Sequence, residues 1–113
     1  MKTIVAGSRN CTDVEIVRRA MNTCPFKITE VVSGCARGVD TIGEQLAERK
    51  GVPVKRFPAN WDRDGKSAGY LRNAEMAEYA EALVAVWDGQ SRGTKHMIDL
   101  AKRKGLMVYI FKA

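Results

Sequence analysis

The sequence predicts an α/β protein, a single Rossmann-like domain in which a five-stranded parallel sheet carries helices on both faces. The first observation is length: 113 residues suit one domain, so we expect the domain to span residues 1–113. The second is that short, continuous apolar runs alternate along the chain with stretches of helical periodicity. The third is that these runs are rich in β-branched residues and lack polar alternation, which is typical of strands buried on both faces.

Five apolar runs are the expected strands. Each is short, and turn residues or helical stretches bound it. The runs are residues 3–7 (TIVAG), 27–34 (KITEVVSG), 52–57 (VPVKRF), 81–89 (EALVAVWDG) and 106–111 (LMVYIF). Because they alternate with helical stretches, we expect parallel pairing and right-handed crossovers.

Four amphipathic stretches between these runs are the expected helices. Thr12 and Glu15 have capping-box spacing at the start of the first, and Gly51 ends the second. Thr94 is the expected cap of the last helix, which Gly105 ends. The expected apolar faces are Val14, Val17 and Met21; Val39, Ile42 and Leu46; Leu71, Ala74 and Ala77; and Met97, Leu100 and Ala101. Residues 58–69 (PANWDRDGKSAG) are predicted to form a long loop.

Composition limits the classes of function. The net charge of +6 favours anionic partners such as nucleotides or nucleic acid, although the basic residues form no long run. No stretch of about 18 apolar residues is present and the start does not resemble a signal peptide, so we expect no membrane partner and a cytoplasmic location. The three cysteines form no CxxC pair and there is one histidine, so we expect reduced thiols, no metal site and no cofactor.

Glycines and polar residues gather after three of the expected strands. In open α/β sheets a ligand binds beyond the carboxyl ends of the strands, where the strand order reverses. Glycines let backbone N–H groups approach an anion, helix N-termini add positive potential, and arginine side chains bind phosphate oxygens in pairs. The expected ligand-binding residues of these turns are Gly7, Ser8, Arg9, Ser33, Gly34, Arg37, Asp88, Ser91, Arg92, Gly93 and Thr94.

These residues also have a structural interpretation. Glycine is common in strand–helix turns for geometry alone, and a serine or threonine before a helix is often a cap. Asp40 is interpreted as a first-turn residue that suits the helix dipole. Trp61 either stacks on a base or covers an edge of the core, and His96 is interpreted as a surface residue. The chain contains no GxGxxG turn and no GxxxxGK[ST] motif, which argues against a dinucleotide Rossmann site and a P-loop.

Four segments resemble the YspA-like branch of the SLOG superfamily, which also contains the DNA-processing protein A domain and the cytokinin-activating LOG phosphoribohydrolases. The segments are AGSR (6–9), SGCARGVD (33–40), FPANWDRDGKSAGYLRN (57–73) and VWDGQSRGTKHMIDLAKRKG (86–105). The resemblance implies the strand order 3-2-1-4-5 and a nucleotide or nucleotide-derived ligand at the carboxyl edge. It also implies that Arg72 and Asn73 face the pocket and that Gly93 and Thr94 hold phosphate. Relatives often form dimers, so a homodimer is one expected assembly.

Three functions are consistent with this resemblance. The first is binding of a nucleotide or nucleotide-derived ligand, as in a sensor. The second is hydrolysis of an N-glycosidic bond in a nucleotide. Here Met97 replaces the catalytic glutamate of the LOG enzymes, so Glu75 or Asp88 would have to act instead. The third is binding of single-stranded nucleic acid, as in the DNA-processing relatives.

Overall fold

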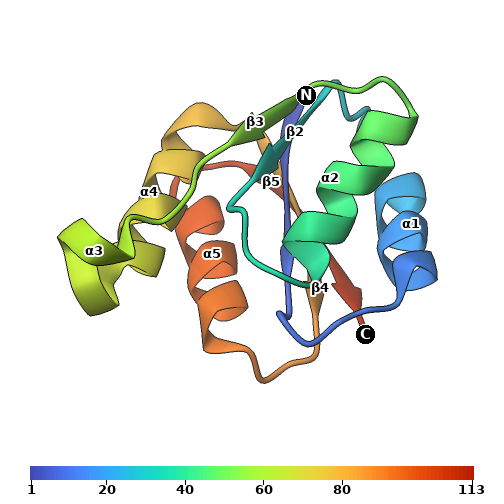
Figure 1. Ribbon diagram of the computed structural model, residues 1–113. Helices are drawn as coiled ribbons and strands as arrows, with labels where there is room; N and C mark the ends of the chain where they lie inside the picture. The colour runs from blue at the N-terminus through green and yellow to red at the C-terminus, as the bar shows by residue number, and fades with distance from the viewer.

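The computed structural model describes residues 1 to 113 and contains one five-stranded sheet. The strand order is β3-β2-β1-β4-β5, and every neighbouring pair is parallel (Figure 1). The strands are β1 (Lys2–Gly7), β2 (Glu30–Ser33), β3 (Val54–Arg56), β4 (Ala82–Trp87) and β5 (Met107–Lys112). The predicted fold class and strand order are confirmed, although β2 and β3 are shorter than the apolar runs that predicted them.

Helices cover both faces of the sheet. The helices α1 (Val14–Thr23) and α2 (Val39–Arg49) lie on one face, and α4 (Ala68–Tyr79) and α5 (Arg92–Arg103) lie on the other (Figure 1). On β1, Val5 packs with the first pair of helices and Ile4 packs with the second, because successive side chains of a strand point to opposite faces. No helix has the length and apolar character that crossing a membrane requires.

Two helix caps differ from the prediction. Asp13, not Thr12, is the N-cap of α1, and its side chain accepts a hydrogen bond from the N–H of Glu15 at 3.0 Å. Ser91, not Thr94, is the N-cap of α5, and its Oγ accepts from the N–H of Thr94 at 3.4 Å. Thr94 is instead buried in the first turn. In both places the observed cap is aspartate or serine, which cap helices more often than threonine does, so the prediction chose the weaker of two candidates.

The buried face of α4 also differs from the predicted one. Leu71 is 46% exposed, and the buried residues are Ala68, Asn73, Met76 and Ala77. A polar residue, Asn73, occupies an inward position of this helix. Of the predicted face, Ala77 is buried as expected and Leu71 is not, so apolar periodicity identified only part of the buried stripe.

Residues 58–69 do not form the irregular loop that the sequence predicted. They contain α3 (Trp61–Asp64) and a short 3-10 helix, η1 (Gly65–Ser67), which leads into α4. Asn60 caps α3 by accepting a hydrogen bond from the N–H of Arg63 at 3.0 Å. Both helices are too short to give an apolar periodicity, which explains the wrong prediction. In Figure 1, α3 projects to the left, away from the sheet.

The two central strands create a crevice at the carboxyl edge of the sheet. β1 and β4 are neighbours, but the chain leaves β1 toward α1 on one face and leaves β4 toward α5 on the other. The two connections therefore diverge, as at the ligand sites of open α/β sheets. Gly7 ends β1 in tight packing, since a Cβ there would lie 2.3 Å from the carbonyl oxygen of Val86 and 2.7 Å from Cγ2 of Val39.

Candidate functional site

A cavity of about 520 Å³ opens at the carboxyl edge, where β1 and β4 diverge. Its walls come from the segment after β1, the start of α2, the region from α3 to α4, and the β4–α5 turn. The volume is typical of a small-molecule site. The predicted residues that line the cavity are Gly7, Ser8, Arg9, Arg72, Asn73, Asp88, Ser91, Gly93 and Thr94. The fold brings them together, and their contact with a ligand stays a prediction.

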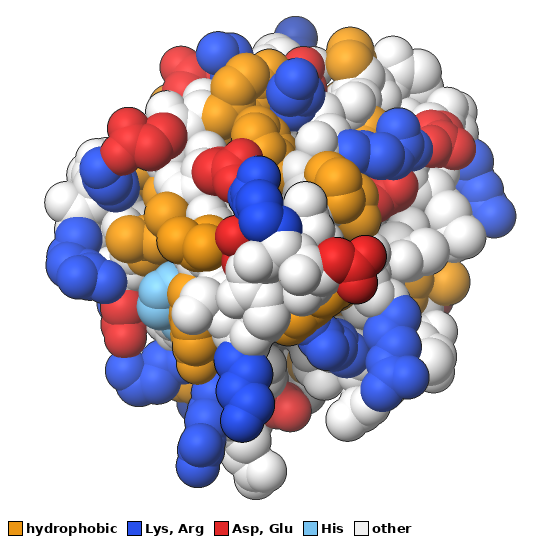
Figure 2. Space-filling view, turned by 60° about the vertical axis from the view of Figure 1, so that its left-hand side comes forward, with side chains coloured by type: hydrophobic (Ala, Val, Ile, Leu, Met, Phe, Trp, Pro, Cys, Tyr) orange, Lys and Arg blue, Asp and Glu red, His pale blue; other side chains and the backbone are white.

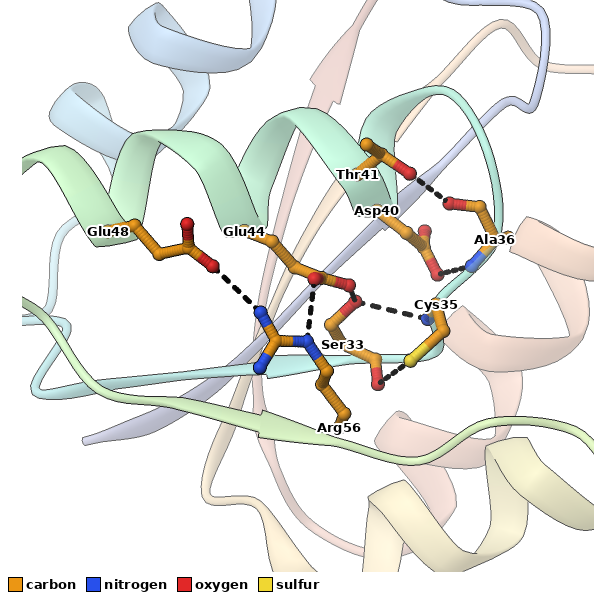
Figure 3. A network of polar contacts seen from close by, with 8 residues as sticks. All are labelled: Ser33, Cys35, Ala36, Asp40, Thr41, Glu44, Glu48 and Arg56. Carbon is orange, nitrogen blue, oxygen red and sulfur yellow. Dashed lines mark hydrogen bonds and ion pairs between the residues drawn. The ribbon is translucent and has the colours of Figure 1, made fainter.

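The other predicted residues lie outside this lining. They are Ser33, Gly34, Arg37 and Arg92. Arg37 is exposed in the β2–α2 turn, and Arg92 lines a neighbouring cavity. Ser33 is fully buried: its Oγ donates to Oε2 of Glu44 at 2.5 Å and accepts from the N–H of Cys35 at 3.1 Å (Figure 3).

Ser33 belongs to a polar network between the sheet and α2. Glu44 also accepts from Nε of Arg56 at 2.8 Å, and Nη2 of Arg56 donates to Glu48 at 2.7 Å (Figure 3). The network joins β2 and β3 to α2. Partial burial and the negative charge of Glu44 raise the pKa of the Cys35 thiol, so it stays protonated at neutral pH and does not favour a nucleophilic role.

A chain of hydrogen bonds positions the two polar residues of α4. Nη1 of Arg72 donates to the carbonyl oxygen of Gly34, and its Nε donates to Oδ1 of Asn73 at 3.1 Å. Nδ2 of Asn73 lies 3.0 Å from Nδ1 of His96. Partial burial and the charge of Arg103 lower the pKa of His96, so we infer that the neutral ring accepts this hydrogen bond at Nδ1.

Asp40 is a buried carboxylate in the wall of the cavity. It lines the cavity but is only 5% exposed. Burial raises the pKa of Asp40 to about 6, while the Arg72 guanidinium and the N–H of Ala36 act in the opposite direction. A Cβ on Gly34 would lie 2.7 Å from Nη1 of Arg72 and 2.9 Å from Oδ2 of Asp40, so glycine leaves room for both groups. The sequence did not predict this placement, because an acidic residue in the first turn of a helix is common without any ligand.

Two half-exposed aromatic residues form another part of the cavity wall. Trp61 is 51% exposed and Tyr70 is 52% exposed. The guanidinium carbon of Arg9 lies 5.8 Å from the centre of the Trp61 ring, within cation–π range. The Tyr70 ring meets the His96 ring edge-on, with centroids 4.5 Å apart. Of the two interpretations of Trp61, the placement favours contact with a ligand over cover for the core.

The sequence did not predict several other lining residues. Two of them adjoin predicted residues in sequence, and the folding of η1, α4 and α5 brings the other four to the cavity. These residues are Asn10, Lys66, Tyr70, Met76, Gln90 and Met97. The available signals were proximity to the predicted turns, for Asn10 and Gln90, and the resemblance, whose third and fourth segments include most of the six.

The β4–α5 turn places the first turn of α5 at the cavity. Gly93 and Thr94 line it, and the N-terminus of this 12-residue helix contributes partial positive charge. Oδ1 of Asp88 accepts from the N–H groups of Gln90 and Ser91, each at 2.8 Å, and these bonds lower the pKa of Asp88. Asp88 therefore stabilises the backbone of the β4–α5 turn.

Neither carboxylate named for the hydrolytic alternative is well placed for it. Asp88 is ionised and already bound by backbone amides, which makes it a poor proton donor. Glu75 is exposed and does not line the cavity. N-glycosidic hydrolysis stays an untested prediction, and the geometry does not favour it through these groups.

A second, shallower cavity of about 470 Å³ adjoins the first. The two share Tyr70, and the second is otherwise lined by Arg92, Lys95, His96 and Asp99. Lys95 pairs with Asp99 at 2.7 Å, whereas Arg92 forms no ion pair. Figure 2 shows basic side chains interspersed with exposed hydrophobic ones on this side of the molecule.

The sequence of the chain is similar to one protein family and to a phage protein. The family model described as the YspA, cpYpsA-related SLOG family matches residues 1–63, a segment that runs from β1 into α3. The chain is 33% identical over 120 residues to the Gene 61 protein of Mycobacterium phage D29, with 97% of this chain and 95% of that protein covered. No solved structure matches the chain.

Proposed function

The chain belongs to the YspA, cpYpsA-related SLOG family, and from this premise we propose that it binds a nucleotide or nucleotide-derived small molecule, as a sensor of that ligand. The observation that carries the proposal is the composition of the cavity between β1 and β4. It combines basic side chains, the amino-terminal turn of α5 and two half-exposed aromatic rings. Basic side chains and a helix N-terminus suit the phosphate of a nucleotide, and the aromatic rings suit its base.

The phosphate is assigned to the part of the cavity formed by the β4–α5 turn. Gly93 leaves this part open, because no atom lies within 4 Å of the position that a Cβ would take. Ser91 and Thr94 provide hydroxyl groups, which lie 3.0 Å apart. The partial charge of the helix N-terminus and hydroxyl donors are typical of phosphate sites.

The base is assigned to the aromatic part of the cavity. Trp61 offers an exposed ring, and Arg9 is already in cation–π range of it. Stacking of a base on an aromatic ring is worth about 1–3 kcal/mol and tolerates every base. The geometry therefore supports a nucleotide without naming its base.

Substitution of Arg9 tests this proposal against a matched arginine. We expect Arg9→Ala to weaken nucleotide binding at least about tenfold, since it removes a charge-assisted contact. Arg37→Ala is the control, because Arg37 is exposed at the same edge of the sheet but does not line the cavity. Isothermal titration calorimetry with common nucleoside mono- and diphosphates measures both. Equal affinities in the two variants would remove Arg9 from the site, and no binding to the wild-type protein would refute the proposal.

A second candidate function is binding of single-stranded nucleic acid, which the adjoining cavity favours. A strand with one nucleotide in the first cavity can pass Tyr70 and bring its next phosphate to Arg92 and Lys95. Binding of this kind weakens steeply with salt, because phosphate contacts release counterions.

Fluorescence anisotropy of a labelled oligonucleotide across a salt series tests the second candidate. We expect Arg92→Ala to reduce the affinity and the salt slope. Lys102→Ala is the control, since Lys102 is a basic residue of the same helix that lines neither cavity. A flat salt response, or equal losses in the two variants, would count against nucleic acid.

A further inference from the structure

The buried carboxylate of Asp40 lines the cavity but belongs neither to the part assigned to the phosphate nor to the part assigned to the base. Carboxylates are almost never this deeply buried unless they are paired, because a charge is costly to remove from water. No ion pair of the structure includes Asp40. The N–H of Ala36 donates to its Oδ2 at 3.4 Å, which is a long hydrogen bond.

A purely structural role explains Asp40 poorly. The N-cap residue of α2 is Gly38, and no side chain caps that helix. An asparagine could accept the same hydrogen bond from Ala36 without the cost of a buried charge. The position lines a cavity, so a carboxylate there is available to a ligand.

The charged groups around Asp40 define what it can bind. The Arg72 guanidinium lies on the other side of Gly34 from Asp40 and does not form a direct ion pair with Asp40. Arg9 is a second positive charge, near Arg72. Glu44, on the same helix, is already bound to Ser33 and Arg56. With its pKa at about 6, the Asp40 carboxylate is mostly ionised at neutral pH and only accepts hydrogen bonds. It therefore repels a phosphate and favours a part of the ligand that carries neutral donors.

Neighbouring residues indicate which part of a nucleotide lies over Asp40. A Cβ on Gly34 would touch both Asp40 and Arg72, and a Cβ on Gly69 would lie within 4 Å of both Arg72 and Trp61. Arg72 therefore connects Asp40 to the aromatic part of the cavity. Between the base and the phosphate of a nucleotide, the neutral donors are the hydroxyl groups of the sugar.

We propose that Asp40 accepts hydrogen bonds from the ribose hydroxyls, so that the cavity selects ribonucleotides over 2′-deoxyribonucleotides. The inference rests on the proposed nucleotide binding and names the class of nucleotide. An acidic side chain that accepts from a ribose 2′-hydroxyl is an established solution to sugar recognition in nucleotide sites. A 2′-deoxyribose keeps its 3′-hydroxyl but leaves one buried carboxylate oxygen without its donor, which penalises that ligand more than a lost surface contact would.

Calorimetry with matched sugars tests the inference. The probes are the common ribonucleoside 5′-monophosphates and their 2′-deoxy counterparts. The proteins are the wild type, Asp40→Asn, and Glu48→Gln as a control carboxylate-to-amide change on the same helix, outside the cavity. We expect the wild type and the control to prefer ribonucleotides by about tenfold or more. Asp40→Asn should lose most of that preference, because its single acceptor oxygen replaces two and is the one that bonds the N–H of Ala36.

The ratio of the two affinities separates sugar recognition from a structural role. A structural role of Asp40 would lower both affinities together and leave the ratio unchanged. Equal wild-type affinities for the two sugars, or an unchanged ratio in Asp40→Asn, would overturn the inference and leave nucleotide binding intact. If no probe binds the wild type, both the inference and its premise fail.

The pH dependence of the wild-type protein provides a readout that needs no variant. Protonation of Asp40 below a pH of about 6 removes its ability to accept from both hydroxyls, so the preference for ribose should decline as the pH falls through that value. A preference that stays constant from neutral pH to about one unit below that pKa would overturn the role of Asp40 even if Asp40→Asn fails to fold.

Discussion

The β2–α2 turn (residues 34–38) and the β4–α5 turn (residues 88–91) contain similar residues but differ in what surrounds them. Each leads to a helix at the carboxyl edge of the sheet, and each, together with its flanking residues, contains glycine, a serine and an arginine. In the first, a Cβ on Gly38 would lie 2.4 Å from the backbone oxygen of Ser8. In the second connection, Gly93 in the first turn of α5 has no neighbour within 4 Å of that position.

The difference shows that similar residues in two strand–helix connections can either pack against the protein or form an open cavity wall. The glycines of the β2–α2 turn allow protein groups to pack closely, and Ser33, which precedes the turn at the end of β2, is bonded to Glu44. The β4–α5 turn instead satisfies its own backbone through Asp88 and leaves an open wall beside the cavity. Substitutions in the first region should therefore change stability, and matched substitutions in the second should change binding.

The largest expected effect is that of Gly38→Ala. Gly38 has a φ of 80° and a ψ of −128°, a conformation that is costly for any other residue, and its Cβ would overlap a backbone atom that cannot move easily. We expect a loss of about 3–4 kcal/mol in the free energy of unfolding. Urea denaturation measures it. A loss below about 1 kcal/mol would mean that the turn relaxes readily and that the proposed contrast between the regions is wrong.

The next largest effect is a gain in stability from Asp40→Asn. The folded-state pKa of Asp40 is about 6, above the ordinary value of 3.8, so the folded protein holds this proton more tightly than the unfolded chain. Stability therefore falls as the pH rises through the interval between these two values, and it is lower by about 2–3 kcal/mol at neutral pH. Asparagine does not titrate and avoids this loss.

Thermal or urea unfolding at several pH values checks the effect of Asp40→Asn. The variant should exceed the wild type at neutral pH, and the advantage should disappear below a pH of about 4. A variant that is less stable than the wild type at neutral pH would show that Asp40 is needed for the structure. Such a result would also weaken the case that a ligand explains its burial.

A smaller effect separates two serines. Ser33 is fully buried and bonded to both Glu44 and the N–H of Cys35, whereas Ser91 is a partly exposed N-cap. We expect Ser33→Ala to cost about 2 kcal/mol, because the Glu44 carboxylate loses a donor, and Ser91→Ala to cost about 1 kcal/mol. Only Ser91→Ala should also weaken nucleotide binding. Calorimetry on both variants, after unfolding measurements, tests this division.

The fold could be predicted from the sequence because it depends on local patterns and on chain-wide alternation. The apolar runs around Val5 and Val84 have no polar alternation, since both faces of the sheet are covered. The strand order followed from the family resemblance. The errors lie where the pattern is too short or ambiguous: α3 has 4 residues and no apolar stripe, and Asn73 occupies a buried position of α4 that an apolar residue usually takes.

The cavity could be predicted in part, for a different physical reason. Sequence places residues at the ends of strands, and this was enough to bring Ser8, Arg9 and Thr94 to one edge. It does not determine the direction of a side chain, which depends on packing. Ser33 is bonded to Glu44, away from the cavity, while Asp40 lines the cavity, although both belong to the same strand–turn–helix segment.

The smallest expected effect on stability is that of Gly93→Ala, and it completes the comparison with Gly38→Ala. Gly93 lies in the first turn of α5, and no atom obstructs a new Cβ. Alanine is a better helix former than glycine, so the free energy of unfolding should stay within about 0.5 kcal/mol of the wild-type value or rise slightly. The added methyl group would project beside the cavity wall that we assign to the phosphate. We therefore expect nucleotide affinity to fall about tenfold while stability is kept, since the backbone can no longer approach the anion closely. Retained affinity in calorimetry would mean that the openness at Gly93 has no role in binding, and the phosphate would have to lie nearer Arg9 and Arg72.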